Sequence, residues 1–181
     1  MSTFKRIADS QVTIAELMLP SHANFSGKIH GGYMLSLMDQ IAFACASKHS
    51  ANYCVTASVD TVDFLRPIEV GELVTLKASV NYVGRTSMVI GIRVEAENIH
   101  TGKTKHCNSS YFTMVAKDNA GKSVEVPGLL LENKTHIRRF IKSLKRKENK
   151  QKRKQEFKDK NFLETDYIDL LKDHRVQIRE S

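Results

Sequence analysis

A single carboxylate, Asp39, interrupts a segment whose apolar residues follow a helical spacing. The apolar positions recur every three or four residues, at Met34, Leu37, Met38, Ile41 and Cys45. This spacing predicts an amphipathic helix that is apolar over most of its circumference and therefore largely buried. Because burying a carboxylate without a partner is costly, Asp39 is either a structural residue bonded to a backbone amide or a general base.

Two glycines, Gly31 and Gly32, directly precede this helical pattern. The first backbone N–H groups of a helix lack intrahelical partners and lie at the positive end of its dipole. Residues without side chains would let a ligand oxygen approach these groups, so the pair is a candidate oxyanion site. The alternative is a turn that requires glycine geometry. The neighbouring His30 is either a substrate contact or a loop residue that bonds locally.

The distance between the glycines and the carboxylate favours a site shared by two chains. Gly31 and Asp39 are eight residues apart, which is about 12 Å along a helix axis. The two residues of one chain therefore need not contact the same ligand atom, whereas a dimer would let Asp39 of one chain face the loop of the other. Asn24, at the head of that loop, offers an amide that can position water or substrate without changing charge.

The segments after the helical pattern alternate apolar and polar residues, as strands with one buried face do. These segments are residues 55–61, 74–80, 88–96 and 105–115, and the breaks between them are residues 64–71, Gly84 and residues 98–103. A short apolar pattern at residues 5–19, ended by Pro20, predicts a leading strand. One long helix followed by antiparallel strands indicates an α+β fold, with a single sheet covering a single helix.

The net charge of +8 is unevenly distributed over the 181 residues. Residues 1–130 contain 12 Lys and Arg against 11 Asp and Glu, whereas residues 131–181 contain 16 against 9. We therefore expect a nearly neutral domain followed by a basic extension that is helical or partly disordered. The extension could bind RNA or an anionic membrane, or could be a solvated helix or arm. Residues 141–156 contain no aromatic residue, which disfavours base stacking.

Several classes of protein are disfavoured by the composition. No apolar run approaches the roughly 20 residues that span a bilayer, and the first ten residues lack the apolar core of a secretory signal. The three cysteines, Cys45, Cys54 and Cys107, are odd in number and lack metal-site spacing. We therefore expect reduced, buried thiols in a cytoplasmic protein, and no bound metal.

The order and spacing of the candidate residues resemble those of the hotdog-fold acyl-CoA thioesterases, in particular the YciA-like enzymes and the brain-type acyl-CoA hydrolases. The matching motifs are Asn24 with Gly27, His30-Gly31-Gly32, Asp39, the segment Ser58–Glu72 and the turn Val83–Met88. The resemblance covers roughly residues 8–116 and leaves out the basic extension. It implies hydrolysis of acyl-CoA to a free carboxylic acid and coenzyme A.

The resemblance also implies an architecture and a division of roles. A long central helix is wrapped by a curved antiparallel sheet, and two chains pair so that their sheets are continuous. Asp39 of one chain acts with Asn24 of the other, and backbone N–H groups near Gly32 polarise the thioester. Whether Asp39 activates water or attacks the thioester directly is left open. Dimers assemble into a hexamer (a trimer of dimers), and no cofactor is needed besides the coenzyme A of substrate and product.

Further residues are candidates for binding the substrate together with His30 and Gly31. In the family, the turn that corresponds to Arg85, Thr86 and Ser87 lies near the coenzyme's nucleotide. Arginine forks and hydroxyl groups suit phosphate oxygens, although a polar hairpin end would look the same. Arg66 precedes a proline and fits either interpretation.

Two other functions are compatible with the same fold. One is an acyl-CoA-binding regulator without catalysis, against which the pair of Asp39 and Asn24 argues. The other is an enoyl-CoA hydratase or dehydratase, which would need a catalytic histidine near the central helix, and His30 keeps that alternative open. We expect the thioesterase, and we expect residues 131–181 to be dispensable for the chemical step.

Overall fold

The computed structural model of the chain describes residues 4–158 and 174–177. By its residue contacts the chain forms two compact units, residues 1–143 and residues 144–181. The strands are β1 (Phe4–Arg6), β2 (Val12–Leu17), β3 (Tyr53–Val59), β4 (Glu72–Val83), β5 (Ser87–Asn98), β6 (Lys103–Lys117) and β7 (Gly128–Leu130). The α-helices are α1 (Gly31–Ser50) and α2 (Lys134–Lys158), and the 3-10 helices are η1 (Ile7–Ser10) and η2 (Pro20–His22).

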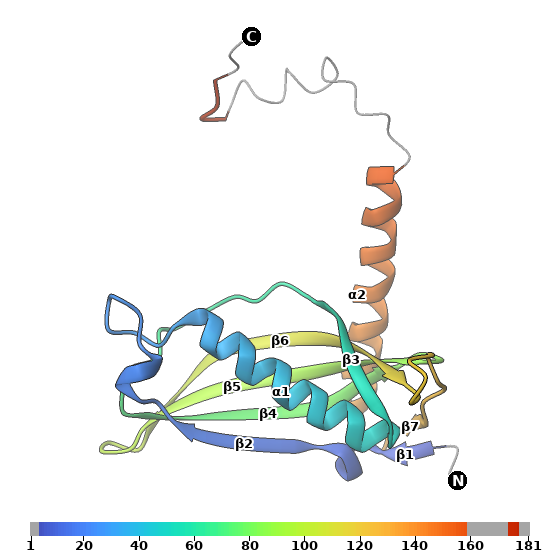
Figure 1. The fold of residues 1–181 in the computed structure, drawn as a ribbon, viewed down its shortest axis with the longest axis horizontal. Helices are drawn as coiled ribbons and strands as arrows, with labels where there is room; N and C mark the ends of the chain where they lie inside the picture. Colours follow the sequence, from blue (N-terminus) through green and yellow to red (C-terminus); the bar gives the residue numbers. More distant parts are fainter. Residues whose placement is uncertain (1–3, 159–173, 178–181) are drawn as a thin grey trace. The chain divides into compact units, whose positions relative to one another are not determined.

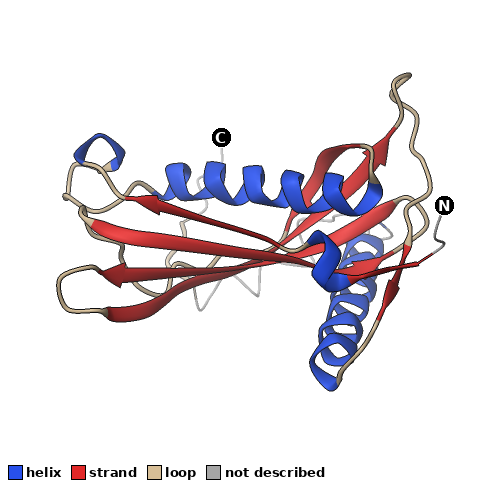
Figure 2. Cartoon of the chain, turned by 90° about the horizontal axis from the view of Figure 1, so that it is seen from below, coloured by secondary structure: helices blue, strands red, loops and turns tan. Residues whose placement is uncertain are grey.

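The helix α1 lies across one face of a five-stranded antiparallel sheet (Figure 1). Seen from a second direction, the helix and the sheet form two layers (Figure 2). The strand order is β2-β4-β5-β6-β3, so β2 and β3 are the edge strands. This arrangement confirms the predicted α+β fold, a long helix covered by a curved antiparallel sheet.

The core lies between α1 and the face of the sheet that is turned towards it. Alternate residues of β4, β5 and β6 are buried there, among them Leu76, Ile90 and Met114. The five apolar positions predicted for the helix are all buried, with at most 5% of each residue exposed. The period of two in the strands and the spacing of three or four in the helix therefore predicted the core correctly.

The expectation that α1 would be largely buried was wrong for one side of the helix. Leu35 and Phe43 are 37% and 39% exposed, and Asp39 and Gln40 are exposed as well. The physical reason is that the sheet of one chain covers only one side of the helix. Asp39 is therefore accessible in the single chain and bears no cost of burial.

The N-terminal segment also differs from the single leading strand that the sequence predicts. It consists of β1, η1 and β2, and β1 pairs in parallel with β7. Both strands of this pair are three residues long. A segment of this length is too short for apolar alternation to distinguish it from a loop, so the pair was not predicted.

The start of α2 packs with the first compact unit. The rings of Tyr82 and Phe140 lie 5.0 Å apart, and Ser143 is buried. The sequence-based division after residue 130 follows the change in charge, whereas the compact unit continues to Ser143 because these side chains pack. Residues 159–173 and 178–181 of the predicted extension lie outside the described residues.

Candidate active site

The start of α1 is capped by His30. The backbone N–H of Gly32 donates to His30 Nδ1 at 3.0 Å, and the N–H groups of Tyr33 and Met34 donate to the His30 carbonyl oxygen. A Cβ atom at Gly32 would lie 3.1 Å from that same ring nitrogen, and one at Gly31 would lie 3.4 Å from the Phe64 ring. Both glycines are therefore explained by close contacts, and the predicted oxyanion donor already has a partner in the single chain.

Asn24 shapes the loop in front of the helix. Its Oδ1 accepts hydrogen bonds from the Ser26 N–H at 2.9 Å and the Ser26 hydroxyl at 2.7 Å, and a third bond comes from the Lys28 N–H at 3.2 Å. Gly27 completes the turn with a φ of 76°. Since the oxygen of the amide is engaged in the turn, its NH₂ group is the part that can donate to a ligand. The turn also holds Phe25 fully exposed at its tip.

Asp39 has a partner that sequence reasoning did not find. The Thr56 hydroxyl donates to Asp39 Oδ1 at 2.6 Å. Thr56 lies on β3, where the register with β6 shifts between Thr56 and Ser58, and such irregularities redirect side chains. In the sequence Thr56 is one polar residue in an alternating strand, so its meeting with Asp39 depends on how β3 packs beside α1.

Apart from Asp39, which lies within α1, the predicted site residues form two groups at opposite ends of this helix in one chain (Figure 1). Asn24, His30, Gly31 and Gly32 lie together at the N-terminal end. Arg66 belongs to a segment that hydrogen-bonds to this loop. In that segment the Ile68 carbonyl oxygen accepts from the Ile29 N–H at 2.9 Å.

The second group, Arg85, Thr86 and Ser87, lies at the turn between β4 and β5. There Arg85 Nε pairs with Glu125 at 2.9 Å, and both side chains are exposed. The Arg85 carbonyl oxygen accepts a hydrogen bond from the Val126 N–H. The carbonyl oxygen of the next residue, Pro127, bonds to His49 near the C-terminal end of α1. Within one chain this turn and the Asn24 loop therefore lie at opposite ends of α1. A site that contains both would require a second chain.

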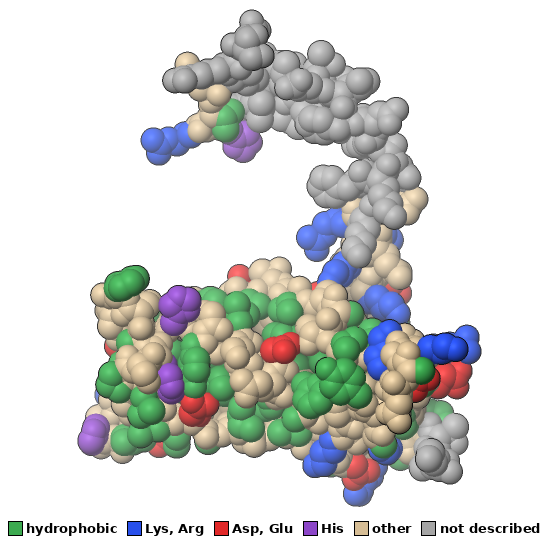
Figure 3. Space-filling model, in the orientation of Figure 1, with side chains coloured by type: hydrophobic (Ala, Val, Ile, Leu, Met, Phe, Trp, Pro, Cys, Tyr) green, Lys and Arg blue, Asp and Glu red, His purple; other side chains and the backbone are tan. Residues whose placement is uncertain are grey.

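Exposed apolar side chains lie on α1, one turn before and one turn after Asp39, and on the edge strand β3. Leu35, Phe43, Tyr53 and Val59 are 37–62% exposed, and we call them the apolar face. Figure 3 shows hydrophobic side chains gathered over the side on which α1 lies. The rings of Phe43 and Tyr53 are in edge contact at 5.5 Å, which joins the helix to the edge strand β3. Surfaces of this kind are typical of protein or ligand interfaces.

The cysteines take no part in this arrangement. Cys45, Cys54 and Cys107 are free and buried, as the sequence predicts. Burial raises the pKa of the Cys45 thiol to about 12, which leaves it protonated and unreactive. Within residues 4–158 and 174–177, no three His, Cys, Asp or Glu side chains are grouped so that they could hold a metal ion. No helix in the same residues is long and apolar enough to cross a membrane.

Comparison with known proteins places this geometry in a family. A model of the thioesterase superfamily matches residues 26–103. The chain is 45% identical to protein VdlD of Helicobacter pylori over 139 residues, which are 77% of this chain and 79% of that protein. It is 34% identical to an uncharacterised acyl-CoA thioester hydrolase of Bacillus subtilis, YkhA, over 81% of this chain and 85% of the relative.

Solved structures agree with the sequence matches. An apo-hexameric acyl-CoA thioesterase superposes with a TM-score of 0.81 at 37% identity, over 83% of this chain and 96% of the other. An acyl-CoA hydrolase of Staphylococcus aureus, in complex with butyryl-coenzyme A, coenzyme A and coenzyme A disulfide, superposes with a TM-score of 0.79 at 31% identity. The matched regions are 86% of this chain and 94% of the hydrolase. The chain therefore belongs to the thioesterase superfamily, among the hotdog-fold acyl-CoA thioesterases.

The staphylococcal hydrolase has also been solved with an asparagine, an aspartate or a threonine replaced by alanine. Those three residues are spaced by 15 and 17 positions along its chain. Asn24, Asp39 and Thr56 have the same two spacings. Thr56, which the structure brings to Asp39, is thus a threonine at the same interval from the aspartate as the threonine that was replaced in the staphylococcal hydrolase.

Proposed function

We propose that the chain hydrolyses acyl-CoA thioesters to a carboxylic acid and coenzyme A, with Asp39 as the catalytic carboxylate. The observation that carries this proposal is the hydrogen bond from Thr56 to Asp39, which holds an accessible carboxylate in one orientation beside an apolar face. Asp39 takes the proton of a water molecule that attacks the thioester carbonyl carbon, or attacks that carbon itself. The carbon–sulfur bond then breaks, and the departing thiolate of coenzyme A takes up a proton. Where Asp39 itself attacks, this step leaves an acyl anhydride on Asp39, which a water molecule hydrolyses to the carboxylic acid and the free carboxylate.

The N-terminus of α1 supplies the electrostatic part of the proposal. Negative charge develops on the thioester oxygen during attack, and helix N–H groups stabilise it. The Gly32 N–H is bonded to the His30 ring in the free chain. A bound carbonyl must therefore displace this ring from Gly32 or use the N–H of Gly31. In this proposal His30 is a local cap that yields to the substrate, and the chemistry needs no cofactor.

The second group of residues is proposed to bind the coenzyme. The Arg85 side chain forms an exposed ion pair with Glu125, and such pairs contribute little stability. A phosphate can therefore replace the carboxylate at small cost, while Thr86 and Ser87 add hydroxyl donors. Arg66 is exposed and has the same capacity at the other end of α1.

Pairing of two chains would bring the two groups together. Asp39 would be completed by Asn24 of a second copy, and the Asn24 loop presents the fully exposed Phe25 for insertion against that copy. The edge strand β3 and the apolar face supply hydrogen-bonding groups and apolar area for such a contact. Following the hexameric relative, we propose dimers that assemble into a trimer of dimers.

Release of free thiol from a panel of acyl-CoA substrates, acetyl to palmitoyl, tests the activity. Asn24→Ala and Asp39→Asn proteins should each be inactive, and mixed dimers formed by subunit exchange should recover one of their two sites. Exchange is verified separately by energy transfer between labelled chains. No recovery despite exchange would contradict the shared site. Binding of acyl-CoA without thiol release would indicate a regulator, and turnover of an enoyl-CoA would indicate a hydratase.

A further inference from the structure

The connection between β3 and β4, residues 60–71, forms no helix or strand and runs from the end of β3 towards the start of α1 (Figure 1). Two backbone hydrogen bonds attach it to β6. The Asp60 N–H donates to the Tyr111 carbonyl oxygen, and the Leu65 N–H donates to the Cys107 carbonyl oxygen, both at 3.0 Å. The path of this connection is therefore set by β6 and not by a repeating structure of its own.

Asn108 attaches the same connection to β6 through its side chain. Its Nδ2 donates to the Asp63 carbonyl oxygen at 2.8 Å, across 45 positions of the sequence. The register between β5 and β6 shifts directly before Asn108, which leaves Cys107 as an extra residue in β6. Such a bulge redirects the neighbouring side chains. It accounts for the Cys107 carbonyl and the Asn108 amide both bonding to this connection.

The Asn108 amide is buried at a local cost. Only 2% of the residue is exposed, and its Oδ1 has no hydrogen-bond partner among residues 4–158 and 174–177. An unpaired buried oxygen is destabilising, and an apolar residue of similar volume would avoid the penalty. Penalties of this kind are typical of functional sites. The useful group at this position is therefore the NH₂ donor that bonds to Asp63.

The residue after Asp63 contacts the start of α1. A Cβ atom added at Gly31, the first residue of the helix, would lie 3.4 Å from Cζ and 3.6 Å from Cε2 of the Phe64 ring. The ring therefore lies directly against the helix backbone. Since Phe64 is 51% exposed, the core does not enclose this ring, and its place depends on the connection that carries it. A continuous set of contacts thus runs from Asn108 through Asp63 and Phe64 to Gly31.

We infer that Asn108 is a positioning residue for the proposed reaction. Through the backbone of Asp63 and the ring of Phe64 it fixes the start of α1, where N–H groups polarise the thioester. The inference rests on the proposed function, because it assigns to Asn108 the placement of those donors. Donors of this kind act only when they are aimed at the developing oxyanion, and a displacement of about 1 Å can cost about 10²-fold in rate.

Thiol release by Asn108→Leu in the full chain tests the inference. Leucine has a similar volume but no donor, so kcat should fall about 10- to 100-fold while KM for acyl-CoA stays within about 3-fold. Ser110→Ala is the matched control. Ser110 is fully buried two positions further along β6, on the same face, and its hydroxyl has no partner in the described part of the chain. Its removal breaks no bond to the connection, so kcat should stay within about 3-fold of the original.

A double variant distinguishes positioning from a general loss of packing. Phe64→Ala removes the ring from Gly31 at an exposed position, so it should lower kcat even if Asn108→Leu does not fold. If Asn108 acts through Phe64, the double variant should be no slower than the slower single variant, because residues that act as a unit are not additive. Effects that multiply fully would overturn the inference. Urea unfolding verifies that each variant is folded under the assay conditions.

Hydrogen exchange at the start of α1 separates this inference from the proposed function. In Asn108→Leu the peptide of residues 29–34 should exchange about 2- to 10-fold faster, the factor that one neutral hydrogen bond contributes. In Ser110→Ala the rate should be unchanged. If the original chain releases no thiol from any acyl-CoA, the proposed function is wrong, and the exchange rate alone decides whether Asn108 positions the helix start. Unchanged exchange in Asn108→Leu, unchanged kcat in an active protein, or equal effects in Ser110→Ala would overturn the inference.

Discussion

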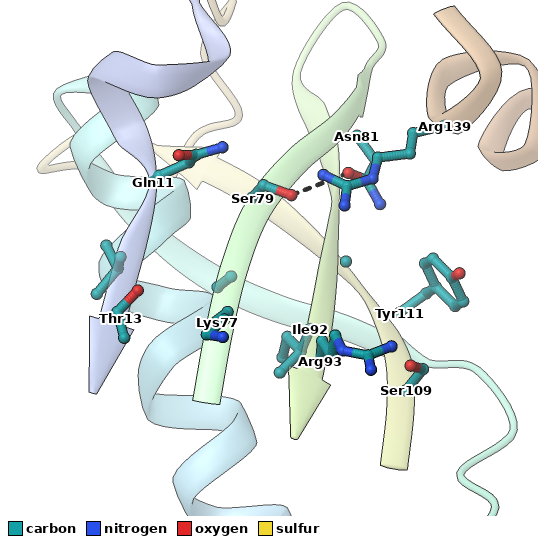
Figure 4. Close-up of a pocket in the computed structure, with 13 residues that line it drawn as sticks. Gln11, Thr13, Lys77, Ser79, Asn81, Ile92, Arg93, Ser109, Tyr111 and Arg139 are labelled. Atoms are coloured by element: carbon teal, nitrogen blue, oxygen red, sulfur yellow. Dashed lines mark hydrogen bonds between the residues drawn. The ribbon is translucent and has the colours of Figure 1, made fainter. Parts of the chain in front are cut away.

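The two faces of the same sheet are built for different tasks. The inner residues of β4, β5 and β6, such as Leu76 and Met114, are completely buried against α1. On the outer face of the sheet, which is turned away from α1, the neighbouring positions include Lys77 and Arg93, which remain exposed and line a polar cavity (Figure 4). Because alternate residues of a strand point to opposite faces, the same strands present apolar side chains to the helix that carries Asp39 and charged side chains on the other face.

This contrast shows which kind of residue can be interpreted from a sequence. An inner residue has one role, burial, which repeats along every strand and is visible as a pattern. An outer polar residue can be a solvated side chain, an ion-pair partner or a ligand contact, and the pattern is the same in all three cases. Only the structure shows that Lys77, Arg93 and Arg139 line the same cavity.

The largest expected effect is the loss of activity on the helix side in Asp39→Asn. The substitution keeps the shape of the side chain and removes the charge, so turnover should fall about 10²- to 10⁴-fold. Thiol release from acyl-CoA measures the rate. Asp9→Asn, which removes an exposed carboxylate paired with Arg6, is the control. A variant that keeps more than about a tenth of turnover would make Asp39 structural.

A pair of adjacent substitutions compares the two faces directly by stability. Leu76→Ala leaves a cavity in the core and should lower the free energy of unfolding by about 2–5 kcal/mol. Lys77→Ala changes an exposed side chain, and Glu95 keeps its second ion pair with Arg93, so the loss should be less than about 1 kcal/mol. Urea unfolding of both variants measures the difference. Similar losses in the two proteins would contradict the assignment of inner and outer faces.

Thr56→Val tests whether the carboxylate must be held in place. Valine keeps the branched shape but cannot donate to Asp39, so kcat should fall about 10- to 100-fold through loss of a hydrogen bond to a charged group. Thr56→Ser retains the hydroxyl and should stay within a few-fold of the original rate. If valine and serine variants turn over equally fast, the hydrogen bond at 2.6 Å has no catalytic role.

The buried His49 should make stability depend on pH at the C-terminal end of α1. Its Nε2 bonds to the Pro127 carbonyl at 3.0 Å and its Nδ1 lies 3.3 Å from the Ser10 hydroxyl. Burial, with a smaller contribution from Lys5, lowers the pKa of His49 below the ordinary 6.5. The unfolded chain therefore binds a proton before the folded chain does, and stability decreases as pH falls below about 6.5.

Unfolding in urea between pH 8 and pH 5 measures this slope, which a single group limits to about 1.4 kcal/mol per pH unit. His49→Gln should flatten it. His100→Gln, at an exposed histidine of the β5–β6 turn, should leave it unchanged. A slope that survives the removal of His49 would have to come from other groups.

The smallest expected effect is that of removing the basic end of the chain. Truncation after Ser143 keeps the contact of Phe140 with Tyr82, which truncation at the change of charge after residue 130 would remove. Turnover at saturating acyl-CoA should stay within about a factor of three, because surface charge acts more on association than on the chemical step. At low salt KM should rise. Complete loss of turnover in a folded, oligomeric truncation would show that the extension completes the site.

The sequence by itself determined the elements that repeat. Apolar spacing identified α1, and period-two alternation identified β3 to β6, because burial acts on every turn of a helix and every second residue of a strand. The resemblance to hotdog thioesterases rested on short motifs in a fixed order, and the comparisons confirmed it. Asp39 stood out for the same reason, since a carboxylate is rare in an apolar helix pattern.

The tertiary structure decided what depends on residues far apart in the chain. Thr56 meets Asp39 only because β3 packs beside α1, the pair of β1 and β7 joins the two ends of the first unit, and Arg139 reaches the sheet only through the packing of α2. The Gly32 N–H, a free donor by sequence, is occupied by His30 because of the loop geometry. No local spacing encodes these contacts, since each arises from the path of the backbone through space and not from the repeat of any one segment.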